Sequence, residues 1–424
     1  MGVFTTALSG LNAATTGLDV IGNNISNSGT IGFKSSRVNF SDIYATSNLG
    51  ISKNTAGSGV QVEGITQQFG QGNLTFTSNN FDMAITGTGF FRLEDNGEVF
   101  YTRAGAFGMD RNGYIVNAIG QRLTGYMADA NGVISGGLVP LQLDTSDSAP
   151  SATTSVAVGV NLDSTQTAPE ATATFNPEDA TTYNHSTSLT AYDSLGNPIL
   201  VTTYYRKSDT LNEWNVYTYI TDPQGNQTEV IPEGGVSGDP LVLSFNADGT
   251  LDSVTPNNGV STAQSAFEPV DPGTGADPLT FTLDLAGTTQ YGAAFSVNNL
   301  EQDGYTTGRL STVTTNEEGI MTARYTNGQT KYIAQVALAD FTNPQGLQQL
   351  GSNTWAETYD SGPPVVGSPG TGTLGLIYAG ALEESNVDLT EQLVNMITSQ
   401  RNFQANAQVI TTADTLTQTI INIR

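Results

Sequence analysis

The sequence predicts an α+β fold, with mainly antiparallel β domains in the middle of the chain and N- and C-terminal α-helices that pair as a coiled-coil-like core. Three observations predict this fold. Apolar residues recur at helical spacing from Met1 to Ser28 and again from Ser385 to Arg424. Between these ends, turn dipeptides separate short runs of alternating apolar and polar residues. The ends are nearly neutral in charge, whereas the middle is strongly acidic.

The N-terminal helix is predicted from apolar residues spaced alternately by four and three positions. A second stripe, which includes Ala7 and Ala14, widens the apolar face beyond what one partner helix would cover. The polar run from Asn23 to Gly29 contains residues that commonly end a helix. We expect this helix to pack against other subunits, through Leu8, Leu11, Leu18, Ile21 and Ile25.

The C-terminal helix is predicted from Leu389 to Arg424, a stretch that contains neither glycine nor proline. Asp388, followed three residues later by Glu391, resembles a capping box at its start. If the whole stretch is helical, it spans roughly 50 Å. The predicted packing stripe of this helix consists of Leu389, Leu393, Met396, Phe403, Ala407, Ile410, Leu416 and Ile420.

One face of the C-terminal helix is polar but uncharged, and it consists of Asn395, Ser399, Asn402 and Asn406. An ordinary solvated helix face more often carries Lys and Glu. Two interpretations stay open from the sequence. The stripe is either a polar flank of a coiled coil, or the lining of a channel that neither binds nor repels a passing chain.

The middle of the chain is predicted to be antiparallel β-structure, arranged as barrels or sandwiches. Alternation of apolar residues supports strands, for example around Met83 and around Val216. Tight turns are expected at Asn96-Gly97, Asn112-Gly113, Asn131-Gly132, Asp248-Gly249, Asn258-Gly259, Asp303-Gly304 and Asn327-Gly328.

Two shifts in composition divide the chain. Thr145 to Ala157 is rich in Ser, Thr, Ala and Pro and is predicted to be a connector. Gly362 to Gly375 is rich in Gly and Pro and is predicted to link into the last helix. The predicted domains are a terminal helical domain with its connecting segment (1–70 and 376–424), a β-domain (71–144 and 299–375) and an inserted acidic outer β-domain (145–298).

The charge distribution limits the classes of partner. The formal net charge is −26, and the stretch from Leu123 to Gly308 carries 22 Asp and Glu against only Arg206 and Lys207. Phosphate binding needs a basic surface, so we expect no nucleic-acid partner. Near-neutral ends can pack together without repulsion, while the acidic middle suits a solvated surface.

Other features bear on location and redox chemistry. There are no cysteines, so disulfide and thiolate chemistry are not available to this chain. No apolar run reaches the length of a membrane span, and we expect no membrane insertion. The N-terminus is not predicted to be a cleaved secretory signal, because its first basic residue is Lys34 and the apolar stretch before it is interrupted by polar residues.

No catalytic, cofactor-binding or metal-binding residues are predicted. His185 is the only histidine, and in its Thr/Ser/Asn context we expect it to face solvent; a hydrolase with His185 as its base is the alternative. Three segments that begin at Asp110, Asp129 and Asn246 mimic the opening of a calcium loop. They lack its closing Glu, so side-chain-assisted turns are the preferred interpretation.

The two ends of the chain resemble the bacterial flagellar rod and hook family. At the N-terminal end the resemblance includes Asn23, Asn24, Asn27, Gly32, Phe33 and Lys34, and it departs only mildly at Thr30-Ile31, where the family usually has two Thr. A further resemblance to the β-domain that the family shares lies in the middle of the chain. The matching segments are Ala7–Ala14, Leu18–Asn27, Gly32–Lys34, Phe81–Phe91, Tyr101–Gly105, Glu384–Leu389 and Gln400–Asn406.

The resemblance implies a structural protein and not an enzyme. The insertion from roughly Thr145 to Asn298 favours a hook-forming member over a distal rod-type member, which is the alternative. Such a subunit would self-polymerise into a curved flexible tube that acts as a universal joint, transmits torque from rod to filament and encloses the export channel. The implied partners are further copies of the chain, the flagellar rod, hook cap and hook-filament junction proteins, and the type III export apparatus. The implied location is extracellular, in the flagellum, after export without a cleaved signal peptide.

Overall fold

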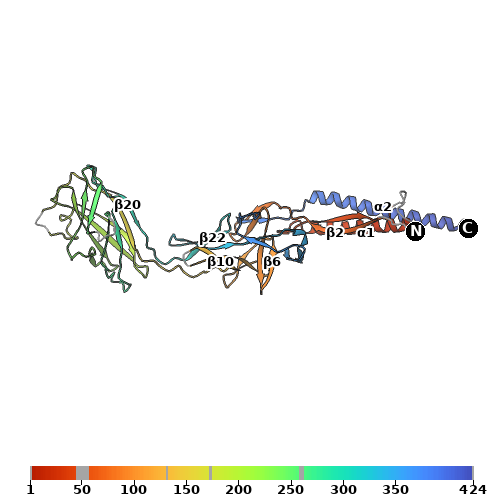
Figure 1. The fold of residues 1–424 in the computed structure, drawn as a ribbon, viewed down its shortest axis with the longest axis horizontal. Coiled ribbons are helices and arrows are strands. Elements are labelled where there is room, and N and C mark those ends of the chain that lie inside the picture. Colours follow the sequence, from red (N-terminus) through yellow and green to blue (C-terminus); the bar gives the residue numbers. More distant parts are fainter. Residues whose placement is uncertain (1, 44–56, 130–131, 171–173, 257–261, 423–424) are drawn as a thin grey trace. The chain divides into compact units, whose positions relative to one another are not determined.

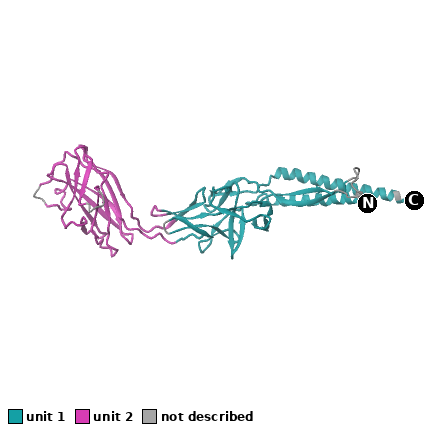
Figure 2. Cartoon of the chain, in the orientation of Figure 1, with its two compact units in different colours: residues 1–145, 311–324, 330–424 teal, residues 146–310, 325–329 magenta. Residues whose placement is uncertain are grey.

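The computed structural model describes residues 2–43, 57–129, 132–170, 174–256 and 262–422. It divides the chain into two compact units (Figure 2). Unit 1 comprises residues 1–145, 311–324 and 330–424, and unit 2 comprises residues 146–310 and 325–329. The two helices lie in unit 1 and the middle of the chain is mainly antiparallel β-structure, so the predicted fold class is confirmed.

Helix α1 spans Gly2–Ser26 and helix α2 spans Leu389–Asn422. The two helices lie side by side, and the chain's N- and C-terminal ends lie at the same end of the pair (Figure 1). Asp388 caps α2 as predicted, because its Oδ1 accepts hydrogen bonds from the backbone N–H groups of Thr390 at 2.8 Å and Glu391 at 3.1 Å. The hairpin of β1 (Ser36–Asp42) and β2 (Val60–Gln67) also contacts α1.

The rest of unit 1 is a β-structure built from segments that precede unit 2 in the sequence and segments that follow it. Two small sheets pair β3 (Leu74–Phe76) with β29 (Ala381–Glu383) and β4 (Met83–Thr86) with β28 (Leu376–Ala379). A short 3-10 helix, η1, spans Pro344–Gly346. The large sheet consists of β5 (Phe90–Asp95), β6 (Glu98–Thr102), β7 (Gly108–Met109), β8 (Ile115–Val116), β9 (Arg122–Ala128), β10 (Ile134–Pro140), β21 (Leu310–Thr315), β22 (Ile320–Tyr325), β23 (Thr330–Val336), β24 (Leu338–Asp340), β25 (Gln348–Gly351), β26 (Thr354–Ala356) and β27 (Val365–Gly367).

Unit 2 contains two sheets. The first has the order β18-β19-β11-β20, with bounds Gln264–Ala266, Thr282–Asp284, Ser155–Asn161 and Ser296–Gln302. Within it β11 and β19 run parallel, and the other pairs are antiparallel. The second sheet consists of β12 (His185–Tyr192), β13 (Pro198–Lys207), β14 (Glu213–Thr221), β15 (Gln227–Val230), β16 (Leu241–Phe245) and β17 (Leu251–Thr255).

Unit 2 has a core that both of its sheets share. Along β14, buried and half-buried residues alternate strictly, so that Trp214 and Val216 point into the core and Tyr217 points away from it. Val156 and Val158 of β11 belong to the same buried cluster. The unit therefore buries large side chains of both sheets in one core, as a β-sandwich does.

Most of the predicted turns lie between paired strands. Asn96-Gly97 joins β5 to β6, and both residues have positive φ, as a tight hairpin turn requires. Turns at Asn112-Gly113, Asp248-Gly249 and Asn327-Gly328 likewise connect adjacent antiparallel strands. The predictions at Asn131-Gly132 and Asn258-Gly259 include residues outside the described part of the chain.

The hairpin prediction at Asp303-Gly304 was wrong. The Asp303 carboxylate accepts hydrogen bonds from the backbone N–H groups of Thr154 and Ser155, far earlier in the chain. A side chain at Gly304 would collide with Thr153. These two residues therefore join β20 to the start of β11 and do not reverse the chain between neighbouring strands.

The domain boundaries of the structure differ from the predicted ones in three respects, one of which is that residues 325–329 belong to unit 2. Residues 299–310 belong to unit 2, because β20 pairs with β11 from Val156↔Gln302 to Asn161↔Ser296. The terminal helices and the family β-domain, predicted as separate domains, lie together in unit 1. A buried ion cluster joins them, as described below.

Candidate self-association site on the terminal helices

Helix α1 presents small residues to its neighbours. Ala7, Ala13, Ala14 and Gly17 are buried, whereas the larger Leu11, Leu18, Ile21 and Ile25 are half-buried. Small side chains let another helix approach closely, and the price in intrinsic helix stability is roughly 1 kcal/mol for each glycine. Of the predicted packing residues on α1, Leu8 stays exposed, with 52% of its surface accessible.

Helix α2 has one half-buried side and one exposed apolar side. Met396, Phe403, Ala407 and Ile410 of the predicted packing stripe are half-buried. The other predicted members, Leu389, Leu393 and Leu416, are exposed, and Leu393 leaves 51% of its surface accessible. The side chain of Ile420 lies outside the described residues.

Near the start of α2, the prediction missed two exposed apolar residues. Val394 and Ile397 leave 57% and 51% of their surfaces accessible, and together with Leu389 and Leu393 they form an apolar patch near the start of the helix. Leu393 and Ile397 follow Leu389 at intervals of four residues and Val394 precedes Ile397 by three, so all four lie on one broad side. A count of apolar residues outside the heptad stripe would have found them. We call these four residues the outer patch.

The polar stripe of α2 is divided by the structure. Ser399 and Asn406 are half-buried and lie against α1: a Cβ added at Gly17 would be 3.6 Å from Ser399 Oγ, and one at Gly10 would be 2.8 Å from the Asn406 amide. Asn395 and Asn402 are exposed. The glycines of α1 therefore make room for two of the four residues, while Asn395 lines, together with Ser399, the groove described next.

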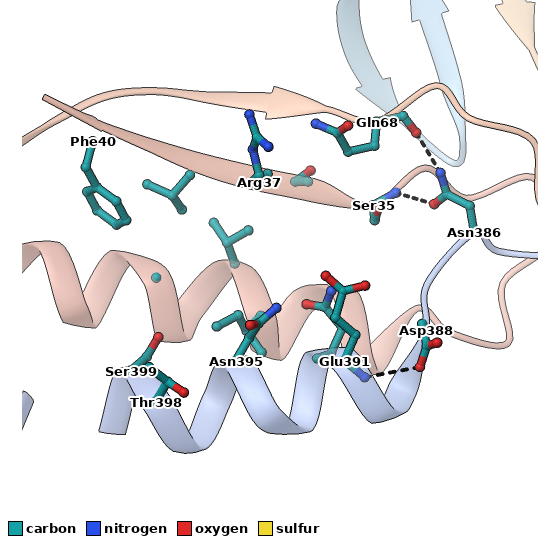
Figure 3. A pocket seen from close by; sticks show the side chains of 16 residues that line it. Ser35, Arg37, Phe40, Gln68, Asn386, Asp388, Glu391, Asn395, Thr398 and Ser399 are labelled. Carbon is teal, nitrogen blue, oxygen red and sulfur yellow. Dashed lines mark hydrogen bonds between the residues drawn. The ribbon is translucent and has the colours of Figure 1, made fainter. Parts of the chain in front are cut away.

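A groove of about 540 Å³ lies between α1, β1 and the first turns of α2 (Figure 3). Its lining mixes apolar side chains such as Phe40 with the charged Arg37 and Glu391. At one end of the groove, Asn386 accepts a hydrogen bond from Ser35 N–H at 2.8 Å and donates one to the Gln68 carbonyl at 2.7 Å. The connection into α2 is thus held to both sides of the β1–β2 hairpin.

The residues of the N-terminal family resemblance at and just after the end of α1 anchor the helix pair. Asn24 is 1% exposed; its Oδ1 accepts from Ser36 N–H at 2.9 Å, and its Nδ2 donates to the Ser36 carbonyl at 2.8 Å. Asn27 donates to the Asn23 carbonyl at 2.9 Å. Gly32 has φ 69° and lies against the backbone of Ala104, where a side chain would collide.

A buried ion cluster joins these anchors to the β-structure of unit 1. Lys34 Nζ donates to Glu383 Oε1 at 2.6 Å, and Arg103 Nη1 donates to Glu383 Oε2 at 3.3 Å. The side chains of Lys34 and Glu383 are fully buried. Burial lowers the pKa of Lys34 below its ordinary value, and the Glu383 carboxylate partly opposes this shift. Phe33, which precedes Lys34 in the chain, is also buried.

The sequence did not identify Glu383 as a functional residue. It precedes the C-terminal motif, and it lies 349 positions from Lys34 in the chain. Arg103 belonged to a segment of family resemblance but had no assigned role. Removing one partner of a buried ion pair is strongly destabilising, because it leaves the other charge buried and unpaired. Glu383 is therefore a structural anchor of both terminal segments.

The expectation that His185 faces solvent holds only in part, because the residue is half-buried. It begins β12, and its ring stacks on Phe295 with centroids 4.4 Å apart. Its Nε2 is buried and has no hydrogen-bond partner among the described residues. Burial lowers the pKa of His185, an effect that Asp163 partly opposes. The ring is thus a packing element at this position, and Nε2 is not paired with a serine hydroxyl of the described chain.

In the acidic turns at Asp110 and Asp129, the carboxylates accept hydrogen bonds from nearby backbone N–H groups. Asp110 Oδ1 accepts from the N–H groups of Asn112 and Tyr114, each at 2.8 Å. Asp129 Oδ1 accepts from Val133 N–H at 2.9 Å. Within the described ranges, no group of three or more His, Cys, Asp or Glu residues could hold a metal ion. Among the described helices, none is long and apolar enough to cross a membrane.

Models of flagellar protein families match successive parts of the chain. The flagella basal body rod protein model matches residues 4–34, and the flagellar hook protein FlgE/F/G D1 domain model matches residues 84–161. The flagellar basal body protein FlaE D2 domain model matches residues 161–305. The model of the C-terminal part of the flagellar basal body rod FlgEFG protein matches residues 378–423.

Whole proteins align over nearly the full chain. The flagellar hook protein FlgE of Escherichia coli (strain K12) is 40% identical over 429 residues, which cover 99% of this chain and 100% of that protein. The corresponding protein of Treponema pallidum (strain Nichols) is 33% identical over 464 residues, covering 98% of each. The crystal structure of Helicobacter pylori flagellar hook protein FlgE2 is similar in fold, with a TM-score of 0.51 at 17% identity over 72% of this chain and 100% of that one.

Proposed function

The chain belongs to the flagellar hook protein family, as a structural subunit of the bacterial flagellar hook, and we propose that its copies polymerise through the terminal helices. The product is a curved flexible tube that encloses the export channel and acts as a universal joint, transmitting torque from rod to filament. The alignment over the whole length of hook proteins, including residues 161–305, favours this function over that of a distal rod-type protein.

The observation that carries the proposal is the outer patch of α2. Leu389, Leu393, Val394 and Ile397 are exposed although they lie on a helix that already pairs with α1. Contiguous exposed apolar residues of this kind mark surfaces that other proteins cover. Further copies of the chain are the occupants we propose, because the ends are nearly neutral and can pack in many copies without charge repulsion.

The acidic unit 2 is proposed to lie outermost in the tube. Its two sheets bury their large side chains in a core within the unit, so the unit has a folding core of its own. Its net negative charge favours solvated and weak contacts between copies. Such contacts would let neighbouring subunits slide as the tube bends.

Export and the remaining partners follow from the same proposal. The chain would leave the cell unfolded through the type III export apparatus without a cleaved signal peptide, and assemble beneath a hook cap. It would then contact the rod at one end and the hook-filament junction proteins at the other. The proposed role is structural and uses no catalytic centre.

The geometry of α2 reduces the number of residues that could line the export channel. Ser399 and Asn406 lie against α1. We therefore propose Asn395 and Asn402, which are exposed, as the members of the polar stripe available to a passing chain. Their uncharged amides would avoid strong attachment to exported proteins of either charge.

The test is to place charge in the outer patch. Leu393→Glu combined with Ile397→Glu should raise the critical concentration for polymerisation more than about tenfold, because burying unpaired carboxylates in an interface is costly. Sedimentation and electron microscopy measure the polymer, and circular dichroism checks the fold. Leu211→Glu is the matched control, since Leu211 is an 86% exposed leucine of unit 2. Normal polymers from the double variant would overturn the proposal.

A further inference from the structure

Contacts between the facing sides of α1 and α2, which we call the seam, recur every seven residues. Asn24 Nδ2 donates to Gln392 Oε1 at 3.2 Å. Seven positions earlier in α1 and seven later in α2, Gly17 faces Ser399, and one more heptad along, Gly10 faces Asn406. Positions rise along one helix as they fall along the other, so the helices are antiparallel. We call these three contacts the polar layers.

Each polar layer pairs a residue of α1 with a polar residue of α2 in a different way. At Gly10 a Cβ would lie 2.8 Å from both the Nδ2 and the Oδ1 of Asn406, closer than real Cβ atoms come to their neighbours. At Gly17 a Cβ would lie 3.6 Å from Ser399 Oγ, which is an ordinary contact. The polar side chain of α2 therefore lies closer to the backbone of α1 at Gly10 than at Gly17.

The Asn24 layer also ties the seam to a third element. The Asn24 amide bonds to both backbone groups of Ser36 at the start of β1, and its Nδ2 is shared between the Ser36 carbonyl and Gln392. Because Asn24 is buried and fixed to β1, it cannot follow α2 if that helix moves. Gln392 therefore has a fixed partner on the seam.

A shift of α2 by three or four residues would replace the polar layers with large apolar side chains. Met396 would then take the place of Gln392 opposite Asn24, and Phe403 would take the place of Ser399 or Asn406 opposite a glycine. A buried amide that loses its partner is costly, and polar residues at single seam positions are known to specify helix register. The layers thus favour one axial position of α2.

We propose that the three polar layers determine the axial register of α2 on α1, with Gln392, Ser399 and Asn406 as positioning residues. The register decides where the outer patch stands relative to the β-structure of unit 1. The register itself is a property of one chain; its consequence for contacts between copies rests on the proposed function. The layers hold Gln392, Ser399 and Asn406 against α1, while the outer patch stays exposed on another side of α2.

Cross-linking can report the register directly, because the chain has no cysteine of its own. The reporter pair is Gly17→Cys with Ser399→Cys, chosen because a Cβ at position 17 would lie 3.6 Å from Ser399 Oγ. A shifted reporter, Gly17→Cys with Phe403→Cys, detects a displacement of four residues. Both are measured in dilute, full-length, unpolymerised protein, so that only contacts within one chain are formed.

The first perturbation is Gly10→Ala, with Gly22→Ala as its matched control. Both changes gain the same helix propensity, but a Cβ at Gly22 has nothing within 4 Å, whereas one at Gly10 meets Asn406. Gly10→Ala should slow cross-linking of the in-register pair about fivefold, and Gly22→Ala should leave it unchanged. Adding Asn406→Ala to Gly10→Ala should restore the rate, because it removes the side chain that the new methyl group meets.

The second perturbation is Gln392→Ala, compared with Gln404→Ala on the exposed side of the same helix. Gln392→Ala should lower the in-register rate and raise the rate of the shifted pair, while Gln404→Ala changes neither. Circular dichroism shows that each variant keeps its helices. Unchanged cross-linking in Gly10→Ala, or failure of Asn406→Ala to restore it, would overturn the proposed register role.

Polymerisation of the same variants, without the cysteines, separates this inference from the proposed function. Where cross-linking shows a displaced α2, the critical concentration should rise as well. A displaced α2 with normal polymerisation would contradict the link between register and assembly while leaving the register role intact. Loss of polymerisation in the outer-patch variants alone would support the proposed function without bearing on the register.

Discussion

The terminal helix pair and unit 2 complete their packing in different ways. Unit 2 buries Trp214 and Tyr205 completely within its own sheets. Among the described side chains of α2, in contrast, none is fully buried, and the buried side chains of α1 are mainly alanines. The comparison indicates that unit 2 has a core of large side chains of its own, whereas the helix pair does not bury its large apolar side chains fully within one chain.

Deleting residues 386–424 should have the largest effect on assembly, and it tests whether the helix pair and the β-structure depend on each other. The deletion removes α2 with the outer patch but keeps Glu383 and the strands of both units. We expect complete loss of polymer, while the β-structure stays folded because its cores do not include α2. Sedimentation and circular dichroism measure the two outcomes. Intact tubes from the truncated chain would refute assembly through the terminal helices.

Glu383→Gln should destabilise unit 1 and leave unit 2 unchanged. The substitution leaves the buried charges of Lys34 and Arg103 without their counter-ion, a change that costs about 3–5 kcal/mol. The two tryptophans report the units separately, with Trp355 in unit 1 and Trp214 in unit 2, so urea unfolding followed in Trp214→Phe and Trp355→Phe backgrounds resolves them.

Glu384→Gln is the control for that experiment, because the neighbouring carboxylate is exposed. It should shift neither transition by more than about 0.5 kcal/mol. Equal loss of stability in both units after Glu383→Gln would contradict their independence.

Excising unit 2 should have a smaller effect on assembly than either change to unit 1. A short Gly/Ser linker in place of residues 147–309 would leave the helices and the Glu383 cluster intact. We expect polymers that still form but bend or curve differently, as judged by electron microscopy. If the variant fails to fold, unit 2 is not an independent outer domain.

The smallest expected effect is the pH dependence of unit 2 through His185. Its folded-state pKa is lowered by burial from an ordinary value of 6.5, so the unfolded chain binds the proton more readily. Stability of unit 2 should therefore be full above about pH 6.5 and fall as the pH drops below that value. His185→Phe, which can keep the stacking on Phe295, should remove this part of the dependence in urea unfolding followed by Trp214 fluorescence. An unchanged pH profile would contradict the role of the buried imidazole.

The sequence predicted the helices well because their signals are local. Apolar spacing and the Asp388 cap placed the start of α2 at Leu389, where the structure has it. Features that depend on distant parts of the chain were not predictable in this way. The boundary of unit 2 lies near residue 310 because β20 returns to β11, and the ion cluster joins Lys34 to a residue 349 positions away.

The polar stripe of α2 shows why a helical face cannot be assigned from one helix alone. Asn395, Ser399, Asn402 and Asn406 are similar in chemistry, and their spacing suggested one surface. Their environment is decided by the partner, because Gly10 and Gly17 of α1 leave room for two of them. The glycines are visible in the sequence, but the side chains that fill the space beside them could be identified only in the folded pair.

Imaging of polymers grown from the full-length chain tests the central claim most directly. The account predicts a curved tube in which α1 and α2 lie at the inner radius, with the outer patch covered by neighbouring copies and unit 2 outermost. A straight tube would favour the rod-type alternative. A polymer held together only by unit 2, with Leu393 and Ile397 still exposed to solvent, would contradict the account.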